Sequence, residues 1–299
     1  MRAFYSDHIS IPLPQGHRFP ADKYRLLRER LARERPQLEL VRSGPATLEQ
    51  ILRVHTIEYL QKLQQGTLTP LEQRRIGFPW SPQLIERSRC STGGTIAAAH
   101  WAIEHRLGIH LAGGTHHAFA DQGQGFCVFN DVAVAIRDLQ HLGKVARAGV
   151  IDLDVHQGNG TAEIFQQDES VFTFSIHGER NFPFRKCAGD WDIGLPDGVE
   201  DATYLATLAS ALADSRFDWN VDVLFYLAGA DPFVRDRLGR MNLSIEGLAA
   251  RDCQVIEQAR IRNIPLVIVM AGGYTNPPDE TAAIHADTVK LALQAFTEQ

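Results

Sequence analysis

The chain has 299 residues, and its 30 lysines and arginines against 36 aspartates and glutamates give a formal net charge of -6. A chain of this length buries roughly three-quarters of its unfolded surface, so it needs neither disulfides nor a metal to fold. A bound metal would therefore be functional rather than structural. The acidic balance argues against nucleic acid as the main ligand, although residues 25–35 are rich in arginine.

Helical and strand patterns alternate along the chain. This alternation indicates βαβ units, and therefore an α/β fold with a parallel β-sheet and helices on both faces. No linker or repeat divides the sequence, so we expect residues 1–299 to form a single domain. Asn130 is expected to cap one helix and Gly143 to end it. The pattern predicts helices over 21–35, 47–64, 82–106, 130–142, 201–214, 244–262 and 279–297, and strands over 108–112, 148–154, 171–176, 222–228 and 265–271.

The cysteines and the N-terminus bear on the compartment. The 4 cysteines are widely spaced and form no CxxC pair, which indicates reduced intracellular thiols. The N-terminal segment has prolines and charges where a secretory signal needs an unbroken apolar core, and no apolar run of about 18 residues occurs. We therefore expect a soluble, cytoplasmic protein with no membrane partner.

Polar or glycine-rich sequence follows every predicted strand. The carboxyl ends of parallel strands lie at one edge of a sheet, where the loops that follow them converge on ligands. We therefore expect these segments to build one site. The segments are GGTHHAFA after 108–112, DVHQGNG after 148–154, IHGER after 171–176, the stretch ending at Asp231 after 222–228, and GGY after 265–271.

Two carboxylates and an imidazole alternate with apolar residues in VIDLDVHQGNG, namely Asp152, Asp154 and His156. If the strand continues through them, all three point to one face, and two desolvated carboxylates there need a cation or hydrogen-bond donors. Asp154, His156 and Asp231 together form a donor set typical of catalytic zinc, although other divalent ions accept it. The alternative is that the aspartates only cap turns or helices.

Three further groups suit catalysis or substrate binding. His116 and His117 are adjacent in a glycine-rich loop and could perform acid/base chemistry, or could be two structural histidines. Tyr274 follows two glycines and could donate a hydrogen bond to an oxyanion, or could be an ordinary tyrosine after a turn. Gly125 and Phe126 could wall a narrow channel, although such phenylalanines usually belong to the core.

Taken together, the motifs resemble those of the zinc-dependent histone deacetylase superfamily, which also holds acetylpolyamine amidohydrolases. The resemblance runs from about Tyr5 to Tyr274, and GHRFPADKY with HQGNG is most similar to the class IV branch and its bacterial relatives. It implies an arginase/deacetylase fold, a zinc cofactor and hydrolysis of N-acyl amides. The motifs that carry it are GGTHHAFADQGQGFCVFNDVAVAI, DLDVHQGNGTAEIF, LAGADPFVRDRLGRMNLS and AGGYT.

The resemblance also implies roles for individual residues. For catalysis, it implies zinc ligation by Asp154, His156 and Asp231, a general base and acid at His117, an electrostatic partner at His116, an oxyanion donor at Tyr274, and Asp152 and Asn159 behind His116 and His117. For binding, it implies an acyl-lysine tunnel of Gly125, Phe126 and Phe182, an arginine at the inner acetate exit, Arg18, and a structural potassium site at Asp152, Ser175 and the His177 region.

Two positions refine this expectation. Many relatives have aspartate where Asn159 stands, and a neutral amide stabilises imidazolium less than a carboxylate does, so His117 should stay neutral at pH 7. Leu238 occupies the position of an acidic gatekeeper in acetylpolyamine enzymes, which favours protein or peptide acyl-lysine over a polyamine or another small N-acyl amine.

Other readings remain open at this level. An arginase-like dinuclear manganese hydrolase is disfavoured because its extra ligands have no evident counterpart. A catalytically inactive relative that binds acylated ligands is disfavoured because such a binder would not need all the catalytic residue types together. The sequence does not fix the acyl length, the physiological target or the oligomeric state.

Overall fold

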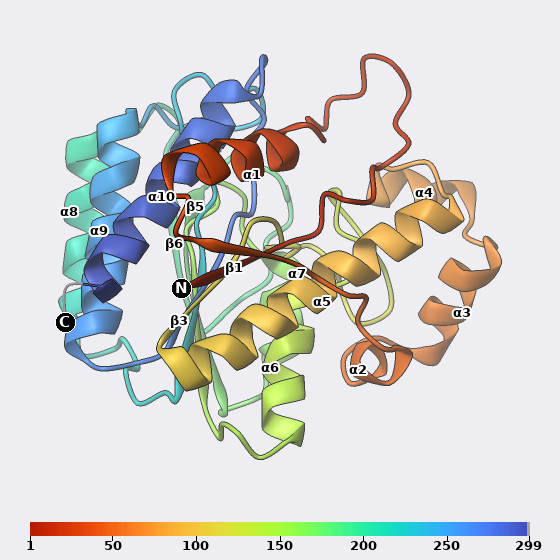
Figure 1. The fold of residues 1–299 in the computed structure, drawn as a ribbon, viewed down its shortest axis with the longest axis horizontal. Coiled ribbons are helices and arrows are strands. Elements are labelled where there is room, and N and C mark those ends of the chain that lie inside the picture. The colour runs from red at the N-terminus through yellow and green to blue at the C-terminus, as the bar shows by residue number, and fades with distance from the viewer. Residues whose placement is uncertain (298–299) are drawn as a thin grey trace.

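Eight parallel strands form one open sheet in the computed structural model, which describes residues 1–297 (Figure 1). The strand order is β2-β1-β3-β8-β7-β4-β5-β6. Every pairing in this sheet is parallel, as the alternation of helices and strands predicts. The strands are β1 (Arg2–Tyr5), β2 (Glu39–Arg42), β3 (Leu107–His110), β4 (Ala148–Asp152), β5 (Val171–Gly178), β6 (Trp191–Leu195), β7 (Val223–Leu227) and β8 (Leu266–Val269).

Helices cover both faces of the sheet (Figure 1). On one face lie α1 (Lys23–Glu34), α8 (Asp201–Ala213), α9 (Ile245–Ile261) and α10 (Asp279–Thr297). On the other face lie α5 (Pro82–His105), α6 (Asp131–His141) and α7 (Asn159–Phe165), with the short helices α2 (Leu48–Leu52), α3 (Ile57–Gln65) and α4 (Pro70–Ile76) beyond α5.

The central strands are buried on both sides because each contributes side chains to the cores under both helical layers. In β7, Leu224 and Tyr226 belong to the core beneath α8 and α9, whereas Val223, Phe225 and Leu227 belong to the core beneath α5 and α6. This alternation follows from the two-residue period of a strand. It also explains why the central strands read as continuous apolar runs in the sequence.

Several elements differ from the sequence-based expectation. The predicted helix 47–64 is two helices, because Thr56 has an extended backbone and caps α3 through a bond from the Tyr59 amide. Strands β1, β2 and β6 were not predicted. The outermost strands, β2 and β6, are only partly buried, so their sequences lack an apolar run. Helices α4 and α7 were also missed. Asn130 caps α6 as expected, by accepting a bond from the Ala133 amide.

The end of β4 requires a correction that bears on the site. The strand ends at Asp152, so Asp154 and His156 lie in the following loop and not on one strand face. They are brought together by the loop's own hydrogen bonds: the Asp154 amide donates to Asp152 Oδ1 at 3.1 Å, and the His156 amide donates to Asp154 Oδ1 at 2.9 Å.

No helix of the described chain is long and apolar enough to cross a membrane.

Candidate active site

Asp154, His156 and Asp231 form a buried cluster at the carboxyl edge of the sheet, after β4 and β7. His156 Nδ1 lies 3.0 Å from Asp154 Oδ1 and 3.0 Å from Asp231 Oδ2. One ligand atom from each residue lies within 4.8 Å of the others. Two carboxylates and an imidazole from two loops therefore converge on one point.

The remaining carboxylate oxygens are held by backbone amides. Val155 donates to Asp231 Oδ1 at 2.9 Å, and Gly272 donates to Asp154 Oδ2 at 2.7 Å. Only glycine fits at position 272, because a Cβ there would lie 1.9 Å from Asp231 Oδ2. The GG of the AGGYT motif thus lets the backbone after β8 close over both carboxylates.

The electrostatics of the cluster fit a divalent cation. Burial and the charge of Asp154 raise the pKa of Asp231 to about 7, because two carboxylates are confined without water. Burial lowers the pKa of His156, but its bonds to Asp154 and Asp231 more than offset this and raise it to about 10. A positive charge is therefore strongly favoured at this point. The donor set and its position at the edge of the sheet suit zinc.

His116 and His117 lie beside the cluster, with ring centroids 4.2 Å apart. His116 Nδ1 bonds to Asp152 Oδ2 at 2.6 Å, and His117 Nδ1 bonds to Asn159 Oδ1 at 2.7 Å. An amide oxygen only accepts, so Nδ1 of His117 donates and its Nε2 is left with a lone pair. The amide orientation is supported by a bond from Asn159 Nδ2 to Gln124 Oε1 at 2.9 Å.

These partners give the two imidazoles different protonation. Burial lowers the pKa of His116, but the charges of Asp152 and Asp154 outweigh it and raise it to about 9. Burial and the charges of His116 and His156 hold the pKa of His117 well below its usual value. At neutral pH, His116 is a cation and His117 is a neutral base.

Tyr274 completes this group, with its ring centroid 6.2 Å from that of His156. Burial and the charges of Asp154 and Asp231 raise its pKa well above the usual value, so its phenol keeps a proton to donate. Its amide donates to Asp236 Oδ2 at 2.6 Å. No pattern in the sequence distinguishes Asp236, because it is one of several charged residues in the segment DPFVRDRLGR.

Lys23 is a second residue that sequence reasoning missed. It is completely buried at the start of α1, and its Nζ donates to the carbonyls of Ala271 and Gly273 at 3.1 and 3.2 Å. Nζ also lies 5.2 Å from the centroid of the Tyr274 ring. Burial lowers its pKa to about 8, against the opposing charges of Asp231 and Asp154. Lys23 therefore holds the loop that carries Tyr274.

This arrangement corrects the expectation for Arg18. The structure places Arg18 at the surface, before the buried Phe19, and the buried cation beside Tyr274 is Lys23. The Arg18 guanidinium stays hydrated at the surface. The Lys23 ammonium can be buried because the Ala271 and Gly273 carbonyls accept hydrogen bonds from it.

The expected tunnel residues lie around His117. The ring of Phe182 meets that of His117 edge-on, with centroids 5.0 Å apart. Gly125 has φ +55°, and a Cβ there would lie 2.6 Å from His117 Cδ2, so the position requires glycine. Phe126 packs 6.1 Å from the Tyr274 ring on the other side. Leu238 is partly buried, and its carbonyl accepts a bond from Asn181 Nδ2 at 2.8 Å.

The end of α4 holds the tunnel loop in place. Gly125 donates its amide to the Arg75 carbonyl at 2.9 Å, and Phe126 donates to the Ile76 carbonyl at 2.7 Å. The sequence did contain a signal for this helix, because Thr69 and Glu72 form a capping box around Pro70. A helix outside the main layers thus holds the loop of Gly125 and Phe126, two of the expected tunnel residues.

The residues expected at a potassium site are brought together only in part. Asp152 and Ser175 are paired across β4 and β5. However, the Ser175 hydroxyl bonds to His177 Nδ1 at 2.8 Å, and the Asp152 carboxylate binds His116 and the Asp154 amide. Ser175 and His177 are therefore bonded to each other, whereas Asp152 is bonded to His116 and to the Asp154 amide.

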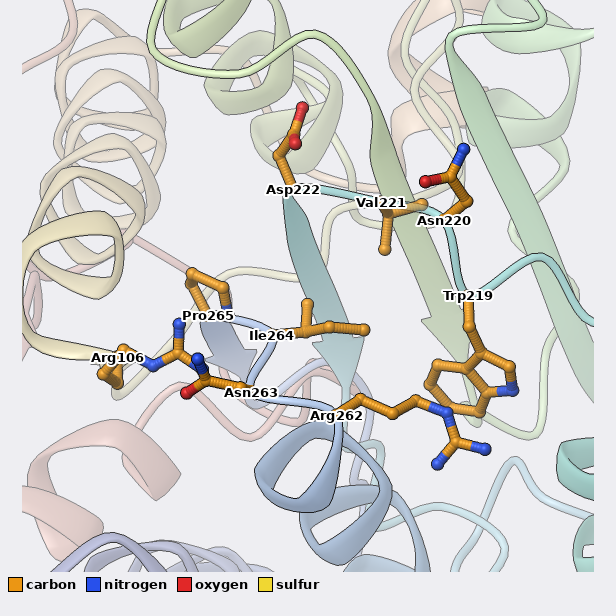
Figure 2. Close-up of a pocket in the computed structure, with 9 residues that line it drawn as sticks. All are labelled: Arg106, Trp219, Asn220, Val221, Asp222, Arg262, Asn263, Ile264 and Pro265. Carbon is orange, nitrogen blue, oxygen red and sulfur yellow. The ribbon is translucent and has the colours of Figure 1, made fainter.

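A separate hollow of about 560 Å³ lies at the opposite edge of the sheet (Figure 2). It is formed by the segments that precede β7 and β8 and by Arg106 after α5. Arg262 stacks over the Trp219 ring at 4.2 Å. None of the residues expected at the site lines this hollow, so it plays no part in the chemistry described above.

A family model described as the histone deacetylase domain matches residues 17–290, which includes every residue of the buried site. The chain belongs to the histone deacetylase family. This is a family of hydrolases that are generally zinc-dependent, which agrees with the buried group of Asp154, His156 and Asp231.

Relatives and solved structures agree with this membership. This chain is 44% identical over 280 residues to an uncharacterized protein of Picosynechococcus, covering 91% of each. It is 30% identical over 257 residues to histone deacetylase 2 of Arabidopsis thaliana, covering 80% of this chain and 64% of that protein. It is 31% identical over 262 residues to histone deacetylase RPD3 of Saccharomyces cerevisiae, covering 80% of this chain and 59% of that protein.

The fold agrees as well. A crystal structure of an HDAC homolog complexed with SAHA superimposes with a TM-score of 0.79 and 23% identity, covering 99% of this chain and 88% of that chain. The HD domain of HDA15 superimposes with the same TM-score and 19% identity, covering 100% and 91%. The open parallel sheet is thus the arginase/deacetylase fold.

Proposed function

We propose that this protein is a zinc-dependent deacylase that hydrolyses the amide of N-ε-acyl-lysine in a protein or peptide. The observation that carries the proposal is the buried triplet of Asp154, His156 and Asp231 beside a neutral imidazole and a protonated phenol. Asp154, His156 and Asp231 would hold the zinc. When bound, the zinc would lower the pKa of a water molecule and polarise the acyl carbonyl.

The chain's own groups account for the proton transfers. His117 is neutral, its Nδ1 proton is held by Asn159, and its Nε2 can accept a proton from the attacking water. Tyr274 donates its phenol proton as a hydrogen bond to the acyl oxygen as negative charge develops there. The protonated His117 then delivers its proton to the departing lysine nitrogen, while the charge of His116 disfavours a long-lived second imidazolium.

The walls of the site favour acyl-lysine as the substrate. The Phe182 ring lies beside His117 and the Phe126 ring lies near Tyr274, and these apolar rings would suit an aliphatic side chain. Leu238 contributes no charge to attract the second ammonium of an acetylpolyamine. The amide at Asn159 and the HQGNG motif support a class IV-like assignment within the family. A cytoplasmic location and a structural potassium at Asp152, Ser175 and the His177 region remain parts of the proposal.

Metal analysis combined with a peptide assay tests this function. We expect the purified protein to bind one zinc and to release acylate from acetyl-lysine peptides, with activity lost on chelation and restored by zinc. Acetylpolyamine, longer acyl and lactyl substrates should be compared in the same assay. Bound zinc without turnover of any substrate would instead indicate a protein that binds acylated ligands.

A further inference from the structure

A second hollow, with a volume of about 530 Å³, lies beside the proposed tunnel. Phe182 is shared between the two, since it lines this hollow and also faces His117. Asn159 and Gln124, which are bonded to each other, line it as well. The hollow therefore borders two residues that contact His117, yet the hydrolysis proposed above uses none of its outer residues.

The outer residues carry positive charge and exposed aromatic surface. Arg75 and Arg185 are both exposed, and Phe184 is 87% exposed. Arg75 donates to Gln122 Oε1 at 2.9 Å. Within residues 1–297, neither arginine forms an ion pair, and no acidic side chain lines the hollow. In a chain of net charge -6, such a site is a local excess of positive charge.

Backbone contacts fix these residues relative to the tunnel. The Arg75 carbonyl accepts the amide of Gly125, so the end of α4 touches the tunnel loop directly. Arg185 and Phe184 belong to the same loop as Phe182, three and two positions further along the chain. An extended peptide advances about 3.3–3.6 Å per residue, so residues next to a lysine in the tunnel come within reach of this hollow.

We propose that Arg75, Phe182, Phe184 and Arg185 form a flanking groove that binds the residues beside the acyl-lysine and selects peptides with a carboxylate side chain within two positions of it. The proposal rests on the proposed deacylase function and names its preferred substrates. A carboxylate accepts paired hydrogen bonds from a guanidinium, and the phenylalanines cover its aliphatic stem. Cationic flanks are repelled, which also disfavours a polyamine.

Three matched acetyl-lysine peptides, with glutamate, alanine or lysine at the flanking positions, test the groove in the holoenzyme. We expect kcat/KM to fall about three- to fivefold from glutamate to alanine and again from alanine to lysine, as for exposed ion pairs. The difference should appear in KM rather than kcat. It should also shrink as salt is raised, because the charges are exposed.

Charge reversal locates the effect. Arg185→Glu, and more strongly the double variant Arg75→Glu with Arg185→Glu, should reverse the order of the three peptides. Arg74→Glu is the matched control, because it makes the same change one residue away on α4 at an exposed position that does not line the hollow. In Arg74→Glu, the order of kcat/KM for the three peptides should remain that of the wild type. An equal shift in Arg74→Glu would show that only the general field matters, and would overturn the groove.

Binding of fluorescently labelled peptides to the same variants separates the two proposals. Equal turnover of all three peptides by the wild type would leave the deacylase function standing and remove the groove. No turnover, with tighter binding of the glutamate peptide that is lost in Arg185→Glu, would remove the deacylase function and keep the groove. Absence of both turnover and discrimination would remove both.

Discussion

At the carboxyl edge of the sheet, the charged groups are buried and hydrogen-bonded. The Gly272 amide donates to Asp154, and the Val155 amide donates to Asp231. At the opposite edge, Arg262 lies exposed over Trp219 at the rim of an open hollow (Figure 2). Water solvates the second kind of charge at little cost, whereas burial of the first kind is expensive.

In this molecule a buried charge is the stronger indication of a functional site, because its burial must be offset by specific partners. A cluster of desolvated carboxylates persists only because backbone amides, an imidazole and a cation-binding geometry offset its cost. Arg262 is exposed and needs no such support, because water solvates its charge. A hollow by itself does not mark the site, since the one of about 560 Å³ at the opposite edge is lined by none of the expected site residues. Substitutions at both edges test this contrast.

Removal of a cluster carboxylate should have the largest effect. Asp231→Ala deletes one of three expected ligands and leaves His156 with a single carboxylate partner. We expect loss of bound zinc and a fall in kcat/KM of about a thousandfold or more, equivalent to several kcal/mol of transition-state stabilisation. Zinc content by mass spectrometry and steady-state kinetics measure both. A variant that kept full zinc and turnover would contradict the assigned site.

Tyr274→Phe should come next. The ring remains packed near Phe126, but the phenol proton is lost. We expect the zinc content to stay unchanged and kcat to fall about 10²–10³-fold, as for other oxyanion donors. Wild-type turnover in this variant would exclude the phenol from the reaction.

Lys23→Met should have a smaller effect that acts through the Tyr274 loop. It leaves the Ala271 and Gly273 carbonyls without their buried donor, which costs about 1–3 kcal/mol for each unsatisfied group. We expect a lower Tm and a fall in kcat of about tenfold. Lys23→Arg keeps donors at this position and should lose less of the Tm and of kcat than Lys23→Met. If the two variants behaved alike, the donor role of Lys23 would be wrong.

Asn159→Asp should change the pH dependence more than the maximal rate. A carboxylate at this position stabilises imidazolium and raises the pKa of His117, which burial and neighbouring charges now hold low. Since the base must be neutral, the acidic limb of the pH-rate profile should move to higher pH by about one unit. Profiles of kcat/KM for both proteins measure the shift, and an unmoved limb would refute the explanation.

Arg262→Ala, at the opposite edge, should have the smallest effect. It removes a cation–π contact with Trp219 that is worth about 0.5–1 kcal/mol at an exposed site. We expect a small decrease in Tm and unchanged kcat/KM and zinc content. A marked loss of activity would show that the two edges are coupled, which would undo the comparison.

The sequence predicted the central part of the fold well and its margins poorly. The strands β4, β7 and β8 are buried on both faces and therefore read as apolar runs, whereas the edge strands β2 and β6 are half exposed and carry no such pattern. The split between α2 and α3 depends on one capping threonine, Thr56, within an otherwise helical pattern.

For the site, the sequence by itself determined which residue types follow each strand, and the parallel topology required them to meet at one edge. It did not determine how they meet. Asp154 and His156 converge through loop hydrogen bonds beyond the end of β4, and Lys23, not Arg18, lies behind Tyr274. The direction of a buried side chain depends on partners that are distant in the chain, such as the carbonyls of Ala271 and Gly273, and only the tertiary structure brings those partners to it.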